Sequence, residues 1–180
     1  EQTDPDHPLF LLLADIAAKH GLPIDLHMEA VLEDQALPPL LAGRSPNNPP
    51  FIKATIPGFE RLLNYNPNAK IVWQHVAWDN TGHMTPDLVR RLLQAHSNLY
   101  CALKFVRKSY EPFQLGRGLM DENGAVRPEW LGLMNEFPDR FMIGADDFIG
   151  ASGARRGGPP SFARTWADID NPIGGTDRLF

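Results

Sequence analysis

Segments of helical and of strand periodicity follow one another along the chain. Helical spacing of apolar residues predicts helices over residues 8–20, 57–65, 85–96 and 128–137. Apolar runs or strict alternation predict strands over residues 22–30, 70–77, 98–106 and 140–148. Helix and strand therefore alternate through four rounds, a pattern that indicates crossover connections and a parallel sheet. We expect the α/β class.

The strand patterns differ in what they indicate about burial. In residues 22–30, apolar side chains alternate with Asp25, His27 and Glu29, which places these three on one face. Residues 70–77 form a nearly continuous apolar run, as in strands that are buried on both faces. The last strand is apolar until Gly144 and then becomes acidic.

A proline-rich segment, residues 37–51, separates the first strand from the next helix. Its composition predicts a long loop. Loops of this length inside a domain are usually functional or disordered. We expect this loop to help cover a substrate and exclude water from it.

Length and composition narrow the class of protein. The chain has 180 residues and 43% hydrophobic content, which suits one domain over residues 1–180 with a sizeable core. Its formal charge of −5 gives no general footprint for nucleic acid. The apolar run near the N-terminus, residues 9–18, is too short to span a bilayer and is interrupted by Asp15, so we expect a soluble protein with no membrane partner. The single cysteine, Cys101, cannot form an intrachain disulfide, which fits the cytoplasm.

Three predicted strands end in a residue that could carry chemistry: His27, His75 and Asp146. The carboxyl ends of parallel strands open onto one face, where binding sites are built. Two imidazoles and a carboxylate suit a divalent metal such as zinc, and a histidine can also move protons near neutral pH. Each residue has a structural alternative: an edge-strand surface for His27, a hydrogen-bonded core histidine for His75, and a helix N-cap for Asp146.

Other polar residues are candidates for substrate contacts. Trp78, Asp79 and His83 follow His75 in a predicted loop and are weaker candidates, because this position favours solvated loop residues. Lys104 could anchor an anionic substrate, or it could extend its ammonium to solvent. The arginines of the glycine-rich segment 153–158 could hold an anion, or the segment could be a flexible exposed loop.

Four of these stretches carry a resemblance to a known family. "PIDLHME", "IVWQHVAWDNTGH", "NLYCALK" and "DRFMIGADDF" resemble the last four strands of the amidohydrolase-related metal-dependent hydrolases. This family includes aminocarboxymuconate-semialdehyde decarboxylase and pyrone-dicarboxylate lactonase, and the resemblance covers residues 22–148. It implies a (β/α)8 TIM barrel in which this chain supplies about the C-terminal half, strands 5–8. It also implies that His27 and Asp146 ligate the metal and that His75, with Asp146, acts in catalysis.

The sequence departs from the family in two ways. It contains no His-x-His pair, which the family carries on its first strand, and its four rounds are half of those a closed barrel needs. A half barrel leaves unpaired sheet edges and an exposed apolar face. We therefore expect a partner: a missing N-terminal half, or further copies in a homo-oligomer.

The resemblance implies a metal-dependent hydrolase acting on a small carboxylated or cyclic substrate, with zinc as the expected metal. Lys104, Trp78 and His83 are the expected substrate contacts. Non-oxidative decarboxylation, a lyase reaction of the same family, is an alternative. Two further alternatives are a metal-independent lactonase and a non-catalytic half-barrel module that assembles with a partner chain.

Overall fold

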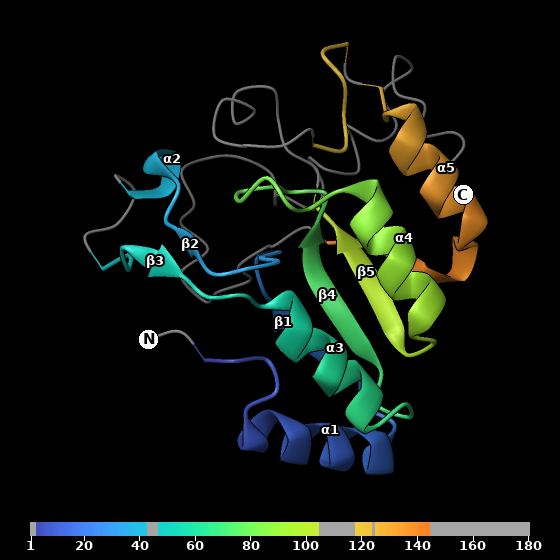
Figure 1. Cartoon of the computed structure of the whole chain (residues 1–180). Coiled ribbons are helices and arrows are strands. Elements are labelled where there is room, and N and C mark those ends of the chain that lie inside the picture. The colour runs from blue at the N-terminus through green and yellow to red at the C-terminus, as the bar shows by residue number, and fades with distance from the viewer. Residues whose placement is uncertain (1–2, 43–46, 105–117, 124, 145–180) are drawn as a thin grey trace, which may run out of the picture.

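Helices and parallel strands alternate in the computed structural model, which describes residues 3–42, 47–104, 118–123 and 125–144 (Figure 1). Most of the helices begin with proline in their first turn, a position where the missing N–H costs nothing. The elements are, in chain order, α1 (Pro8–His20), β1 (Ile24–His27), β2 (Gln35–Ala36), α2 (Pro39–Ala42), β3 (Phe51–Ile52), α3 (Ile56–Tyr65), β4 (Ile71–Val76), α4 (Pro86–Ala95), β5 (Leu99–Leu103), α5 (Pro128–Glu136), the 3₁₀ turn η2 (Pro138–Arg140) and β6 (Phe141–Ile143).

The main sheet has four parallel strands in the order β1-β4-β5-β6. The strand order follows the chain, and a helix connects each strand to the next. Parallel crossovers are almost always right-handed, so a sheet that grows in one direction carries its connecting helices on one face. Figure 1 shows α3 and α4 in front of β4 and β5. The α/β class predicted from periodicity is confirmed.

Each predicted helix and strand contains an element of the predicted type, although the strands are shorter than expected. Strand β1 ends at His27 rather than at residue 30, and β5 ends at Leu103 rather than at residue 106. The part of the last predicted strand that follows Gly144 lies outside the described residues.

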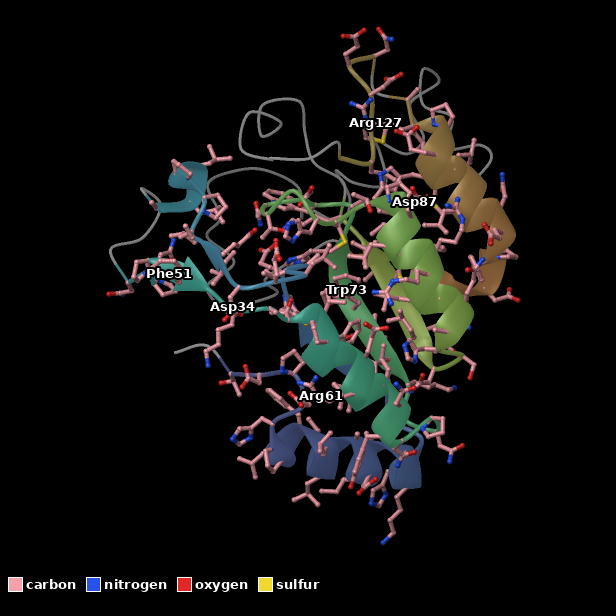
Figure 2. All side chains as sticks on the ribbon, in the orientation of Figure 1. Asp34, Phe51, Arg61, Trp73, Asp87 and Arg127 are labelled. Carbon is pink, nitrogen blue, oxygen red and sulfur yellow. The ribbon has the colours of Figure 1, made fainter. Side chains whose placement is uncertain are left out.

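The expectation of one long loop over residues 37–51 is wrong in part. This region holds the short helix α2, and β2 and β3 pair antiparallel at its two ends. The backbone N–H of Leu37 also donates to the carbonyl oxygen of Pro50 at 2.9 Å. Strands of two residues are too short to show a period of two, and the prolines around them conceal the pairing. We call the described residues 35–42 and 47–52 the arch; Phe51, labelled in Figure 2, lies on it away from α3 and α4.

The face of the sheet that meets the helices forms the apolar core. Trp73 of β4 packs against Phe59 of α3 with ring centroids 5.2 Å apart, and its indole N–H donates to the carbonyl oxygen of Met28 at 2.8 Å (Figure 2). Cys101 is buried in the same core. Burial raises the pKa of the Cys101 thiol, which excludes it as a thiolate nucleophile near neutral pH.

The opposite face of the sheet is more polar. Gln74 donates from Nε2 to Asp25 Oδ1 at 2.9 Å, across β4 and β1. A β-carbon at Gly144 would lie 3.1 Å from the β-carbon of Ala102 and 3.3 Å from Oε1 of Gln74. The space at Gly144 is therefore closed by residues of β4 and β5, including the carbonyl oxygen of Leu103 at 3.3 Å. Within the described residues, no helix has both the length and the apolar character needed to cross a bilayer.

Helix α1 carries an apolar stripe on its outer side. Ala14 and Ala17 are buried, whereas Leu9, Leu12, Leu13 and Ile16 have exposed fractions of 67%, 54%, 42% and 46%. Their spacing of three and four residues puts these four side chains on one side of the helix. Among the described strands, β1 and β6 each have one neighbour, so they are the edge strands of the main sheet.

We expect the chain to self-associate as its concentration rises, because burial of the exposed α1 stripe against another surface is favourable. Leu12→Lys should weaken this association by placing an ammonium in the centre of the stripe. Light scattering over a concentration series measures the effect. Asn64→Lys, at an exposed position of α3, adds the same charge as a control. A monomer at every concentration would contradict the prediction.

Candidate functional site

The site is built around a β-bulge at the end of β4. Trp73 pairs with Cys101 and Val76 pairs with Leu103, so β4 advances three residues where β5 advances two. Trp73 and Val76 both belong to the apolar core. The two residues between them, Gln74 and His75, therefore cannot alternate across the sheet, and the extra residue is accommodated by a local change of backbone.

That change is visible in the backbone angles. His75 has φ 63° and Ala77 has φ 71°, both in the left-handed region that side chains other than glycine rarely adopt. Such strain persists only where the surrounding structure imposes it, and it occurs often at functional sites. Here the residue that bears the strain is the histidine that the sequence singles out.

The bulge brings His75 to the histidine of the neighbouring strand. The His27 and His75 rings meet edge to face, with centroids 4.7 Å apart and planes at 87°. His27 is the last residue of β1 and is exposed, whereas His75 is half-buried and its Nε2 atom is buried. Two of the three predicted strand-end residues are thus adjacent at the carboxyl end of the sheet.

A second pair of predicted residues also meets at this end. The ammonium of Lys104 lies 4.6 Å from the ring centroid of Trp78, a cation–π contact. The Trp78 indole N–H donates to Oδ1 of Asn80 at 2.6 Å, and Nδ2 of Asn80 donates to Oε1 of Glu29 at 2.7 Å. Asn80 therefore connects the loop after β4 to the segment after β1.

The loop after β4 is folded against the sheet, so the interpretation of its polar residues as solvated loop residues is wrong. Asp79 is 1% exposed and its Oδ1 accepts from the backbone N–H of Thr81 at 3.1 Å and of Gly82 at 2.7 Å. His83 is half-buried, and its Nδ1 accepts from the backbone N–H of Leu32 at 3.1 Å. These contacts fix the loop to the segment after β1.

A cavity of about 390 Å³ opens beside His27, between the end of β1 and the arch. His27 and Glu29 are part of its floor, and residues of the arch form the opposite side. The loop expected to cover a substrate does line this cavity. The lining residues are Thr3, Asp4, Pro5, His27, Met28, Glu29, Val31, Leu37, Leu41, Asn48, Pro49, Ile52, Lys53, Thr55 and Thr81.

The described residues offer only part of a metal site. In the portion of the chain that the structure places, no three His, Cys, Asp or Glu side chains cluster as a metal would require. The His27 and His75 imidazoles are nitrogen ligands of the kind that zinc takes, but a four-coordinate site needs more. Asp146, the third predicted strand-end residue, lies outside the described residues, as does segment 153–158.

Sequence reasoning missed the part played by Glu29 and Asn80. Glu29 shares the face of His27 in the alternating pattern of residues 22–30, and that spacing was the available signal. Asn80 gives no such signal, because its role depends on how the loop after β4 folds back toward β1.

Comparisons with protein-family models, with curated proteins and with solved structures found no match to this chain. A functional proposal therefore rests on the geometry described above and on the sequence resemblance.

The left-handed backbone at residue 75 makes a prediction about stability. Without the imidazole, His75→Gly should be more stable than His75→Ala by about 1 kcal/mol, because glycine adopts positive φ without a steric cost. Urea unfolding of the two variants measures this difference.

Gln74 provides the matched control, because it precedes His75 in the same strand and is not among the described residues with positive φ. At this position the order should be reversed: Gln74→Ala should be more stable than Gln74→Gly, since glycine loses more conformational freedom on folding. An alanine advantage at both positions would show that the bulge relaxes when the imidazole is removed.

Proposed function

We propose that this chain is part of a metal-dependent hydrolase of the amidohydrolase type, acting on a small carboxylated or cyclic substrate. In this proposal its sheet supplies strands 5–8 of a (β/α)8 barrel. The sequential order of the parallel strands and the helices on one face support a barrel rather than a doubly wound sheet. The observation that carries the proposal is the contact of His27 and His75 at the carboxyl ends of adjacent strands.

His27 is the described residue best placed to ligate the metal, because its imidazole is exposed at the end of β1 and borders the cavity. The resemblance adds Asp146 as a second ligand. A divalent metal, when bound, supplies water of lowered pKa and polarises a carbonyl group. The remaining ligands come from outside the described residues.

His75 is assigned to proton transfer. Its imidazole lies against His27, and the bulge holds its backbone in a strained conformation that sets the direction in which the side chain leaves the strand. A histidine positioned in this way can take a proton from water and return it to a leaving group. The same geometry serves a decarboxylase, in which the proton goes to carbon after loss of carbon dioxide.

Lys104 is assigned to a substrate carboxylate. Its ammonium lies over Trp78, whose indole is held by Asn80, so the charge is positioned before the substrate arrives. Pre-positioned cations lose less conformational entropy on binding. His83 is assigned to support of the loop rather than to direct contact, since its Nδ1 is already engaged by the backbone of Leu32.

A second candidate, a non-catalytic assembly module, is favoured by one observation: the exposed apolar stripe of α1. A metal-independent lactonase would use the same histidines without an ion. Metal analysis of the complete protein distinguishes the two enzymes, because only the metal-dependent hydrolase should retain a divalent ion. Turnover of a substrate distinguishes both enzymes from the non-catalytic module.

The first test of the proposed enzyme is His75→Gln. In the complete protein we expect kcat to fall by roughly two to four orders of magnitude, because general acid–base catalysis contributes about that much. Turnover of lactones, esters and amides provides the assay, and metal content and fold should be retained.

His83→Gln is the control, since it also removes an imidazole from the loop region and should change kcat far less. If His75→Gln unfolds the protein but leaves activity per folded molecule intact, His75 is a structural histidine and the assignment is wrong.

The second test compares two adjacent carboxylates. Asp146→Ala should nearly abolish activity and weaken metal retention, because the resemblance makes Asp146 a ligand, whereas Asp147→Ala should do neither. Elemental analysis and turnover measure both effects. If Asp147→Ala abolishes activity instead, the strand register assumed here is wrong by one residue. If neither substitution changes activity or metal content, the metal site is refuted.

A further inference from the structure

The side chains that line the cavity beneath the arch determine which chemical groups can bind there. We infer that it binds an apolar, uncharged group of the substrate, aromatic or branched aliphatic, which is attached to the bond that reacts beside His27. The binding of this group is a property of the cavity itself; its place in a reaction rests on the proposed function.

The walls are largely apolar. Side chains from the segment after β1 and from both ends of the arch supply this surface, namely Met28, Val31, Leu37, Leu41, Pro49 and Ile52. Burial of an apolar group against such side chains contributes about 25 cal/mol for each Å² removed from water.

Three neutral polar side chains of the cavity hydrogen-bond to the backbone. Thr55 donates from its hydroxyl to the carbonyl oxygen of Glu29 at 2.6 Å and accepts from the N–H of Val31 at 3.0 Å. The hydroxyl of Thr81 donates to the carbonyl oxygen of Ala30. Nδ2 of Asn48 donates to the carbonyl oxygen of Leu41 at 2.8 Å. These groups hold the walls in place, so they contribute little polar recognition.

The charged side chains of the cavity carry both signs. Lys53 is a cation, whereas Asp4 and Glu29 are carboxylates, and Oε1 of Glu29 already accepts from Nδ2 of Asn80 at 2.7 Å. A charged ligand of either sign would meet a like charge as well as an opposite one, whereas an uncharged group meets no like charge. The apolar walls are therefore the main reason for choosing an uncharged group.

The two ends of the arch are held together by their own contacts. The β2–β3 pairing closes the arch at its base, where the backbone N–H of Ala54 also donates to Oδ1 of Asp34 at 2.8 Å. Figure 1 shows β2, β3 and α2 standing to one side of the main sheet. The cavity lies between these elements and the end of β1.

The side wall formed by residues 3–5 is anchored independently. Arg61 donates from Nε to Oδ2 of Asp6 at 2.6 Å. At Gly58 a β-carbon would lie 2.9 Å from Oδ1 of Asp6 and 3.1 Å from Cδ of Pro5. The absence of a side chain at Gly58 is therefore what lets this wall pack against the start of α3.

The size of the cavity suits a small organic group. Its volume of about 390 Å³ exceeds the voids left in packed interiors and falls in the usual range of ligand pockets, about 300–1,000 Å³. A cavity of about 150 Å³ lined by apolar side chains is enough for benzene, so a bicyclic ring fits here. His27 borders the cavity and touches His75, which places the reacting end of the substrate at the floor.

Binding of 2-naphthol to the full chain without added metal tests the inference. Calorimetry should detect binding to the wild type at millimolar concentrations or below. Leu41→Trp and Ile52→Trp fill the cavity from two positions on the arch, and each should weaken binding at least tenfold. Leu40→Trp is the matched control: it adds the same side chain to α2 at a residue that does not line the cavity, so binding should persist.

Two results would overturn the inference: no binding to the wild type, or equal binding by the wild type and both filled variants. If the filled variants do not fold, Leu41→Ala replaces them, and binding unchanged from the wild type would then overturn it as well. If only the filled variants lose binding and the protein turns over no lactone, ester or amide, the inference about the cavity is supported and the proposed function is contradicted.

Discussion

One additional residue in β4 determines the arrangement of the candidate site. Trp73 and Val76 both lie in the core beneath the helices, although residues three apart in a regular strand point to opposite faces. Between them, β4 therefore contains one residue more than β5 does. The chain resolves this conflict by placing His75 and Ala77 in the left-handed region, at a cost of about 1–2 kcal/mol each. Burial of Trp73 and of the residues that follow offsets that cost, and the contact between His75 and His27 is its result.

The surroundings of this histidine pair are organised by contacts between distant segments. The loop after β4 is fixed to the segment after β1 by Thr81, His83 and Asn80. The end of β1 in turn forms the floor of the cavity. A small number of hydrogen bonds between segments about fifty residues apart thus joins the histidines, the Trp78–Lys104 pair and the cavity at one end of the sheet.

Sequence alone predicts the order and type of the main helices and strands, because their apolar periodicity is strong and proline marks the start of several helices. It also identifies His27 and His75 as strand-end residues. It does not predict the bulge, since the apolar run of β4 looks continuous and a shift of one residue leaves no pattern. The arch was interpreted as a loop because two-residue strands have no readable period, and Asn80 depends entirely on tertiary contacts.

The segment that forms the side wall of the cavity leads directly into α1. Residues 3–5 border the cavity, Asp6 is paired with Arg61, and the exposed leucines of α1 begin three residues later. A protein surface that settles on α1 and a small molecule that enters the cavity would therefore both act on the same short piece of chain. By thermodynamic linkage, if both favour particular positions of this piece, each must alter the affinity of the other by the same factor.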